Sequence, residues 1–205
     1  MNIHLCKNDL PFPINTKAVA LDTETMGLNP HRDRLCVVQL NGGGPDTYLI
    51  QIEKSIEPAP LLISLLKDPE VVKIFHYARF DMAVLYTAFG VMPQPVYCTK
   101  IASKLARTYT DRHGLKELCR DLLSTDLSKF EQSSDWGKSF LTEEQKRYAA
   151  RDVAYLHQLK DKLSQMLVRE NRDKLLTAAC HFLSTRVMLD LKGWEGDIFA
   201  HGHTS

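Results

Sequence analysis

Short runs of apolar and β-branched residues dominate the first quarter of the chain. The runs cover residues 17–23, 34–40 and 47–52, and the sequence Asn-Gly-Gly-Gly-Pro-Asp at 41–46 separates the last two. Runs of this kind between turn residues are typical of β-strands, and short turns favour antiparallel neighbours. The pattern therefore predicts an antiparallel meander of three strands.

A second group of elements follows the meander. The pattern predicts a short helix over 60–66, a buried strand over 71–75, a helix through 81–89 and an extended segment at 96–98. Gly90 is expected to end the second of these helices, since glycine is the residue preferred just after a helix. The strand passes directly into a helix, which indicates a β-to-α connection.

The second half of the chain has helical periodicity. Apolar residues spaced three and four apart predict helices over 101–107, 114–123, 143–168 and 172–191. Thr142 and Gln145 have the spacing of a capping box that opens the third of these helices. Strands followed by helices predict a mixed α/β domain with a helical C-terminal half.

Composition narrows the class of protein only modestly. The chain has 205 residues, of which 44% are hydrophobic and 25% charged, as in an ordinary globular protein. No run reaches the roughly 18 apolar residues of a membrane span, and residues 1–13 lack the basic and apolar regions of a signal peptide. We therefore expect a cytoplasmic protein without a membrane partner. Its five cysteines include no Cys-x-x-Cys pair, so neither a zinc ribbon nor a disulfide framework is indicated.

Acidic residues stand at the ends of two predicted strands. Asp22 and Glu24 close the first strand, and residues two apart on a strand face the same side. Asp81 follows the strand over 71–75, at the start of a helix, and strand ends of this sort gather where sites commonly form. Each motif alone has a simpler interpretation: a solvated strand end or ion pair for the first two acids, and a first-turn helix acid for Asp81.

A third motif lies on the predicted helix over 143–168. Tyr148 and Asp152 are four residues apart and share one helix face. Four carboxylates and a phenol from three elements suit two hard divalent cations, Mg²⁺ or Mn²⁺. Two such ions about 4 Å apart activate water and stabilise the leaving oxygen of a phosphodiester. Together the motifs predict metal-dependent phosphodiester hydrolysis.

These motifs, in this order, resemble the DEDD superfamily of 3′-to-5′ exonucleases, in its tyrosine-bearing branch. They are DTET at 22–25, HYARFDMAVL at 76–85 and YAARD at 148–152, and the segment SSDWGKSFLTEEQKRYAARDVAYL strongly resembles ribonuclease D. The resemblance spans about residues 17–159. It implies a ribonuclease H-like fold, in which a mixed five-stranded sheet is flanked by helices.

The resemblance also implies roles for the acidic residues. Asp22, Glu24 and Asp152 would hold the ion that carries the attacking water, and the product would be a 5′-nucleoside monophosphate. Asp22 and Asp81 would serve the second ion. A phenol has an ordinary pKa near 10 and is a poor base at neutral pH. We therefore expect Tyr148 to orient the water and contact the phosphate.

Three further residues are candidates for substrate binding: Thr23, Leu28 and His76. The sequence Met-Gly-Leu after the acids resembles oligoribonuclease, whose equivalent leucine wedges between two bases, which would be Leu28 here. Alternatively, Leu28 packs a turn after Gly27. His76 is either a phosphate contact or a buried histidine at a strand end.

The organisation of the chain bears on the length of its substrate. We expect one exonuclease domain over 1–205, with a core at about 17–168, a C-terminal helix and tail over 171–205, and no additional RNA-binding domain. Such a chain resembles a group of short ribonuclease D-like bacterial nucleases that degrade very short RNAs, including dinucleotides, and assemble into rings. The aromatic residues of the tail, Trp194 and Phe199, and the last predicted helix are candidate subunit contacts in such a homo-oligomer, with core packing as the alternative for the helix.

Net charge favours a short substrate as well. The formal net charge is +1, and affinity for long nucleic acid scales with the number of phosphates that Lys and Arg neutralise. Two alternatives remain open. One is a 3′-to-5′ exonuclease acting on longer RNA or on single-stranded DNA. The other is a non-catalytic nucleic-acid-binding or scaffold module, which the presence of all four acids and the tyrosine disfavours.

Overall fold

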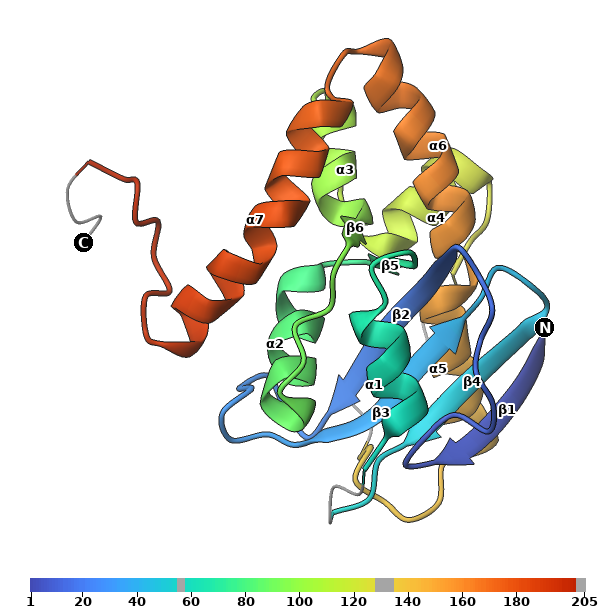
Figure 1. The fold of residues 1–205 in the computed structure, drawn as a ribbon. Coiled ribbons are helices and arrows are strands. Elements are labelled where there is room, and N and C mark those ends of the chain that lie inside the picture. Colours follow the sequence, from blue (N-terminus) through green and yellow to red (C-terminus); the bar gives the residue numbers. More distant parts are fainter. Residues whose placement is uncertain (55–57, 128–134, 202–205) are drawn as a thin grey trace.

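A mixed β-sheet with helices on both faces forms the centre of the molecule (Figure 1), as the computed structural model shows for residues 1–54, 58–127 and 135–201. The strands are β1 (Asn2–Lys7), β2 (Ala18–Thr25), β3 (Leu35–Asn41), β4 (Asp46–Gln51), β5 (Val72–Phe75) and β6 (Val96–Cys98). The helices are α1 (Pro60–Lys67), α2 (Ala78–Phe89), α3 (Thr99–Ala106), α4 (Leu115–Leu123), α5 (Glu143–Ala154), α6 (Leu156–Arg169) and α7 (Asp173–Leu191). The last four residues of the predicted tail and the first two of the ribonuclease D-like segment lie outside the described residues.

The sheet has the strand order β1-β4-β3-β2-β5-β6. Strands β2, β3 and β4 pair antiparallel, which confirms the predicted meander. Strands β5 and β6 continue the sheet parallel to β2. The carboxyl ends of β2, β5 and β6 therefore meet at one edge of the sheet.

The predicted α/β fold class is confirmed, but the described part of the chain has six strands where five were expected. The additional strand is β1, which lies at the edge of the sheet and pairs parallel with β4. Most of its side chains are exposed, so the sequence shows no buried face from which to predict it. Its side chains Asn2 and His4 both bond the carboxylate of Asp46, at 3.0 and 2.9 Å.

The prediction of a single helix over 143–168 is also wrong. The chain bends at Tyr155 and forms two helices, α5 and α6. The bend contains no glycine or proline, so local sequence gives no signal for it. Helix α5 packs on β2, β3 and β4, whereas α6 packs on β5, α3 and α4. His157, just after the bend, bonds the backbone oxygen of Asn41 at 2.9 Å. The packing of two different neighbours thus accounts for the bend.

Side chains along β2 alternate between two cores. Val19 and Leu21 pack with α1 and α2 on one face, and Ala20 packs with α5 and α6 on the other. Because successive side chains of a strand point to opposite faces, Asp22 and Glu24 continue the row of Ala20 toward α5. Thr23 continues the row of Leu21 toward α2. None of the described helices is long and apolar enough to cross a membrane.

Candidate active site

Three carboxylates converge at the carboxyl end of β2. Asp22 and Glu24 come from the strand and Asp152 comes from α5, which lies over it. One carboxylate oxygen of each lies within 4.8 Å of the others. The fold therefore brings together three residues that the sequence analysis selected, although Asp152 lies more than a hundred positions after the other two.

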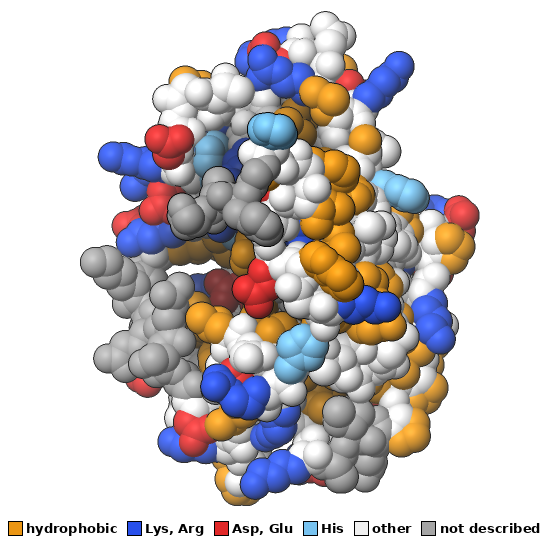
Figure 2. Space-filling model, turned by 90° about the vertical axis from the view of Figure 1, so that its left-hand side faces the viewer, with side chains coloured by type: hydrophobic (Ala, Val, Ile, Leu, Met, Phe, Trp, Pro, Cys, Tyr) orange, Lys and Arg blue, Asp and Glu red, His pale blue; other side chains and the backbone are white. Residues whose placement is uncertain are grey.

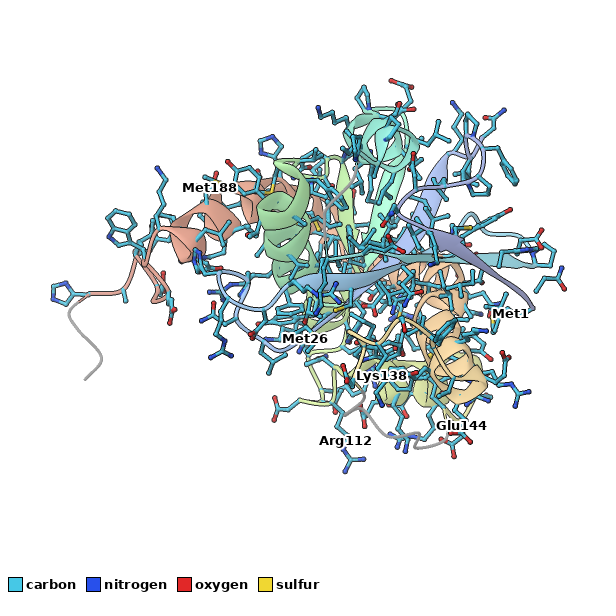
Figure 3. All side chains as sticks on the ribbon, turned by 90° about the horizontal axis from the view of Figure 1, so that it is seen from below. Met1, Met26, Arg112, Lys138, Glu144 and Met188 are labelled. Atoms are coloured by element: carbon cyan, nitrogen blue, oxygen red, sulfur yellow. The ribbon has the colours of Figure 1, made fainter. Side chains whose placement is uncertain are left out.

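Loops beside the carboxylates are tied to each other. Figure 3, seen from below, shows Met26, just after β2, near Lys138, in the loop before α5. Arg34 donates hydrogen bonds from Nη1 to the backbone oxygen of Ile52 at 3.0 Å and from Nη2 to that of Gly137 at 3.2 Å. Arg34 therefore links the ends of β3 and β4 to the segment around Gly137.

Asp81 joins the cluster from the other face of β2. It lies in the first turn of α2, is buried, and accepts a hydrogen bond from Thr23 Oγ1 at 2.7 Å. It is not one of the three groups whose oxygens are mutually close, but its charge acts on those of Asp22 and Glu24. The side chain of Thr23, predicted to bind substrate, thus positions Asp81 in this structure.

Burial and mutual repulsion make the ionised form of these carboxyl groups unfavourable, which raises their pKa values. Burial, followed by the charges of Asp81 and Asp152, raises the pKa of Asp22 well above its ordinary value. Burial, followed by the same two charges, raises the pKa of Glu24 to about 8. Burial raises the pKa of Asp81 and of Asp152 to about 7. Carboxylate oxygens gathered at this distance are the ligands that hard divalent cations prefer, and such ions would compensate the charge.

These pKa values predict how Mg²⁺ stabilises the protein. Carboxyl groups in the unfolded chain ionise near pH 4, whereas Glu24 in the folded protein ionises only near pH 8. Without metal, the folded state holds protons that the unfolded state has lost, so the free energy of unfolding falls as pH rises from about 4 to about 8. We expect Mg²⁺ to raise the Tm more at pH about 8 than at pH about 5, as measured by thermal unfolding with Mg²⁺ or a chelator. An equal rise at both pH values would contradict this.

Tyr148 lies on α5, and a capping box fixes the N-terminus of this helix. The predicted capping box is present: Thr142 N–H donates to Gln145 Oε1 at 2.8 Å, and Gln145 N–H donates to Thr142 Oγ1 at 3.2 Å. The ring of Tyr148 lies 6.1 Å from that of Trp136, which is buried beneath the helix. The capping box thus confirms the predicted helix start, and Trp136 supports the ring of this tyrosine.

Leu28 projects from the loop between β2 and β3, with 84% of its surface exposed. The loop is ordered by Asp33, which accepts a hydrogen bond from Asn29 N–H at 3.0 Å and donates its own N–H to Asn29 O at 2.7 Å. A Cβ atom at Gly27 would lie 2.3 Å from the Asp33 carboxylate, so a larger residue there would displace the Asp33 side chain. The exposure of Leu28 argues against the interpretation that it packs the turn.

His76 follows β5 and is fixed by Thr99. The buried Thr99 hydroxyl donates its one hydrogen to Phe75 O at 3.1 Å, so His76 Nδ1 must donate to Thr99 Oγ1 at 2.9 Å. Burial, followed by the charge of Lys100, lowers the pKa of His76 to about 4. The neutral ring in this tautomer leaves Nε2 as an acceptor. With Nε2 as an acceptor, the ring cannot donate a hydrogen bond to phosphate oxygens.

A pocket of about 460 Å³ lies next to Leu28. Its lining includes Leu28, Tyr77, Arg79, Phe80, Asp190 and Glu195. On the side of the molecule where α7 lies in Figure 1, Figure 2 shows a hollow with acidic side chains inside it and hydrophobic and basic side chains around it. Tyr77 and Arg79 lie within the HYARFDMAVL motif, but their residue types alone do not mark them as site residues.

A sheet of this order, with carboxylates on β2, α2 and α5, defines a nuclease of the metal-dependent exonuclease class. A family model described as 3′-5′ exonuclease matches residues 6–168, and the chain belongs to this family. Ribonuclease D from Gluconacetobacter diazotrophicus is 36% identical over 154 residues, which are 75% of this chain and 39% of that protein. This chain thus spans about two fifths of that relative's length.

Solved structures give a more particular relationship. NrnC from Brucella melitensis bound to pGG is 58% identical, with a TM-score of 0.95 over 98% of this chain and 100% of that one. The same protein with bound Mg²⁺ is 57% identical, with a TM-score of 0.94 over the same shares. Ribonuclease D from Escherichia coli is 28% identical, with a TM-score of 0.76 over 84% of this chain and 45% of that one. The predicted relation to ribonuclease D-like exonucleases is confirmed. The group of short bacterial nucleases that the sequence resembles is the nano-RNase C (NrnC) type, to which these Brucella structures belong.

Proposed function

We propose that this exonuclease acts on very short RNAs, dinucleotides included, and releases 5′-nucleoside monophosphates at the end of RNA degradation. The observation that carries the proposal is the exposed Leu28 beside a pocket of about 460 Å³. An apolar side chain held outward there can separate two bases, which defines a site for a short strand. The similarity to NrnC, which was solved with pGG, supports the same substrate class.

The roles of the acidic residues follow from their placement. Asp22, Glu24 and Asp152 would hold one divalent cation, and Asp22 and Asp81 a second. Mg²⁺ or Mn²⁺ bound there would lower the pKa of a bound water molecule and would neutralise charge on the leaving oxygen. Thr23 fixes the Asp81 carboxylate through its hydroxyl, at 2.7 Å.

Two residues of the site would contact substrate or water. The Tyr148 hydroxyl orients the attacking water and contacts the phosphate. His76, with Nε2 as an acceptor, would receive a hydrogen bond from a sugar hydroxyl rather than donate one to phosphate. Short RNA is the proposed partner, and single-stranded DNA is the alternative polymer.

We also propose a single exonuclease domain that assembles into a homo-oligomeric ring. Exposed apolar side chains on α7 and after it provide the surface for subunit contacts: Leu175, Phe182, Trp194, Ile198 and Phe199. Burial of such a patch in a partner is a common reason for its presence. Location in the cytoplasm stays a prediction from the sequence.

A length series tests the proposed substrate. We expect kcat/KM to be highest for a dinucleotide and to fall for RNAs up to about twenty nucleotides, because the chain has little excess positive charge with which to hold a long strand. The 5′-labelled oligomers are digested with Mg²⁺ or Mn²⁺, with a chelator as the control. Equal degradation of long strands would support the alternative, an exonuclease on longer RNA or DNA. Hydrolysis that the chelator does not stop would contradict the metal site.

Replacement of Leu28 gives a second prediction. Leu28→Ala removes apolar contact worth about 1.5–3 kcal/mol, so we expect kcat/KM for a dinucleotide to fall about 10- to 100-fold. The Tm should not change, because Leu28 is exposed. Leu5→Ala, at an exposed leucine on β1, is the matched control. Equal activity of the Leu28 and Leu5 variants on a dinucleotide would rule out the wedge.

A further inference from the structure

Tyr77 has an unusual backbone conformation for a bulky residue. It caps the N-terminus of α2 with φ 71° and ψ 44°, in the left-handed region, and its side chain makes no capping hydrogen bond. Asparagine and glycine tolerate this region best. Tyrosine at this position therefore lowers the free energy of unfolding, and asparagine at the same position would raise it again.

Packing does not account for this cost. Tyr77 is 47% exposed, so much of its ring remains outside the core. Lys100 places its Nζ atom 4.4 Å from the ring centroid and thereby covers one face of the ring. Strained residues of this kind persist where the ring itself is needed, and they concentrate at functional sites.

The surroundings of Tyr77 indicate a function for its exposed ring. The ring borders the pocket that Leu28 also lines, and Tyr77 is four residues before Asp81. Arg79, also in this segment, donates to both carboxylate oxygens of Asp190 on α7, at 2.5 and 2.6 Å. The start of α2, which carries Tyr77, is thus tied to α7.

We propose that Tyr77 is a substrate-binding residue on which one nucleobase of the short RNA stacks. This inference rests on the proposed function and deepens it, since it gives the pocket beside Leu28 a base as its occupant. Every base has a π-face, so stacking on Tyr77 binds any base with little preference among sequences. The contact adds binding energy at the base and leaves the chemistry at the phosphate unchanged.

Two variants separate a stacking role from a structural one. Tyr77→Asn should raise the Tm, because asparagine tolerates the left-handed conformation better than tyrosine does, and should raise KM for a dinucleotide about tenfold or more with little change in kcat. Tyr77→Phe keeps the ring and should keep the KM. A Tyr77→Asn protein with lower Tm and unchanged KM would overturn the proposal.

Abasic dinucleotides test the contact without relying on a variant's folding. The wild-type protein should lose affinity when the base is missing at one of the two positions, and Tyr77→Asn should not distinguish that substrate from the intact one. Wild-type kinetics that are indifferent to both missing bases would overturn the stacking. If the wild-type protein prefers long RNA but the abasic penalty still depends on Tyr77, the proposed substrate class fails and the stacking stands.

Discussion

Asp152→Asn is expected to lower kcat/KM for RNA by about 10³-fold, the equivalent of about 4 kcal/mol of lost stabilisation of the transition state. The Asp152 carboxylate comes within 4.8 Å of those of Asp22 and Glu24. An amide keeps the shape of the side chain but removes a charged oxygen ligand. Activity with saturating Mg²⁺ and Mg²⁺ affinity by calorimetry both measure the loss.

The stability of the Asp152→Asn protein should show that its loss of activity is not caused by unfolding. Burial raises the pKa of Asp152 to about 7, so its charge opposes folding of the metal-free protein at higher pH. The metal-free Asp152→Asn protein should therefore have a Tm at pH about 8 that equals or exceeds that of the wild type. Asp161→Asn, at an exposed acid on α6, is the matched control. A variant that keeps more than about a tenth of wild-type activity would remove Asp152 from the proposed metal site.

Tyr148→Phe should lose about 100-fold in kcat, the usual effect of removing one aligned hydrogen-bonding group at a transition state. The phenyl ring can keep its place 6.1 Å from Trp136, so the substitution removes only the hydroxyl. All four carboxylates remain, and we expect Mg²⁺ affinity to be unchanged. Single-turnover rates together with Mg²⁺ titration separate the two quantities.

Tyr109→Phe provides the control, because Tyr109 is largely exposed on the loop between α3 and α4. Full turnover by Tyr148→Phe would show that the hydroxyl does not orient the water. Loss of Mg²⁺ affinity would instead assign the hydroxyl a role in holding the metal. The smaller loss compared with Asp152→Asn follows because a neutral hydroxyl contributes less than a charged ligand.

Local signals were sufficient for most of the elements that carry the site. Apolar runs and the Gly-rich turn predicted the meander, and the capping box of Thr142 and Gln145 predicted the start of the helix that carries Asp152. These features depend on residues only a few positions apart, so the sequence alone contains them. The order of the acidic motifs indicated the exonuclease class for the same reason.

Contacts between distant segments were decided by the tertiary structure. The edge strand β1 gains its order by pairing with β4, about forty residues later, and the bend at Tyr155 follows from different neighbours for α5 and α6. The strained Tyr77, the outward Leu28 and the tautomer of His76 likewise depend on neighbours that periodicity does not reveal.

The sequence by itself determined which side chains can bind cations and on which elements they lie, because residue type and short-range periodicity are written in the chain. The tertiary structure alone decided how closely the carboxylates of Asp22, Glu24 and Asp152 approach and how far burial raises their pKa values. The physical reason is that desolvation and repulsion depend on distances across the folded molecule, and these distances exist only after the sheet and α5 have packed.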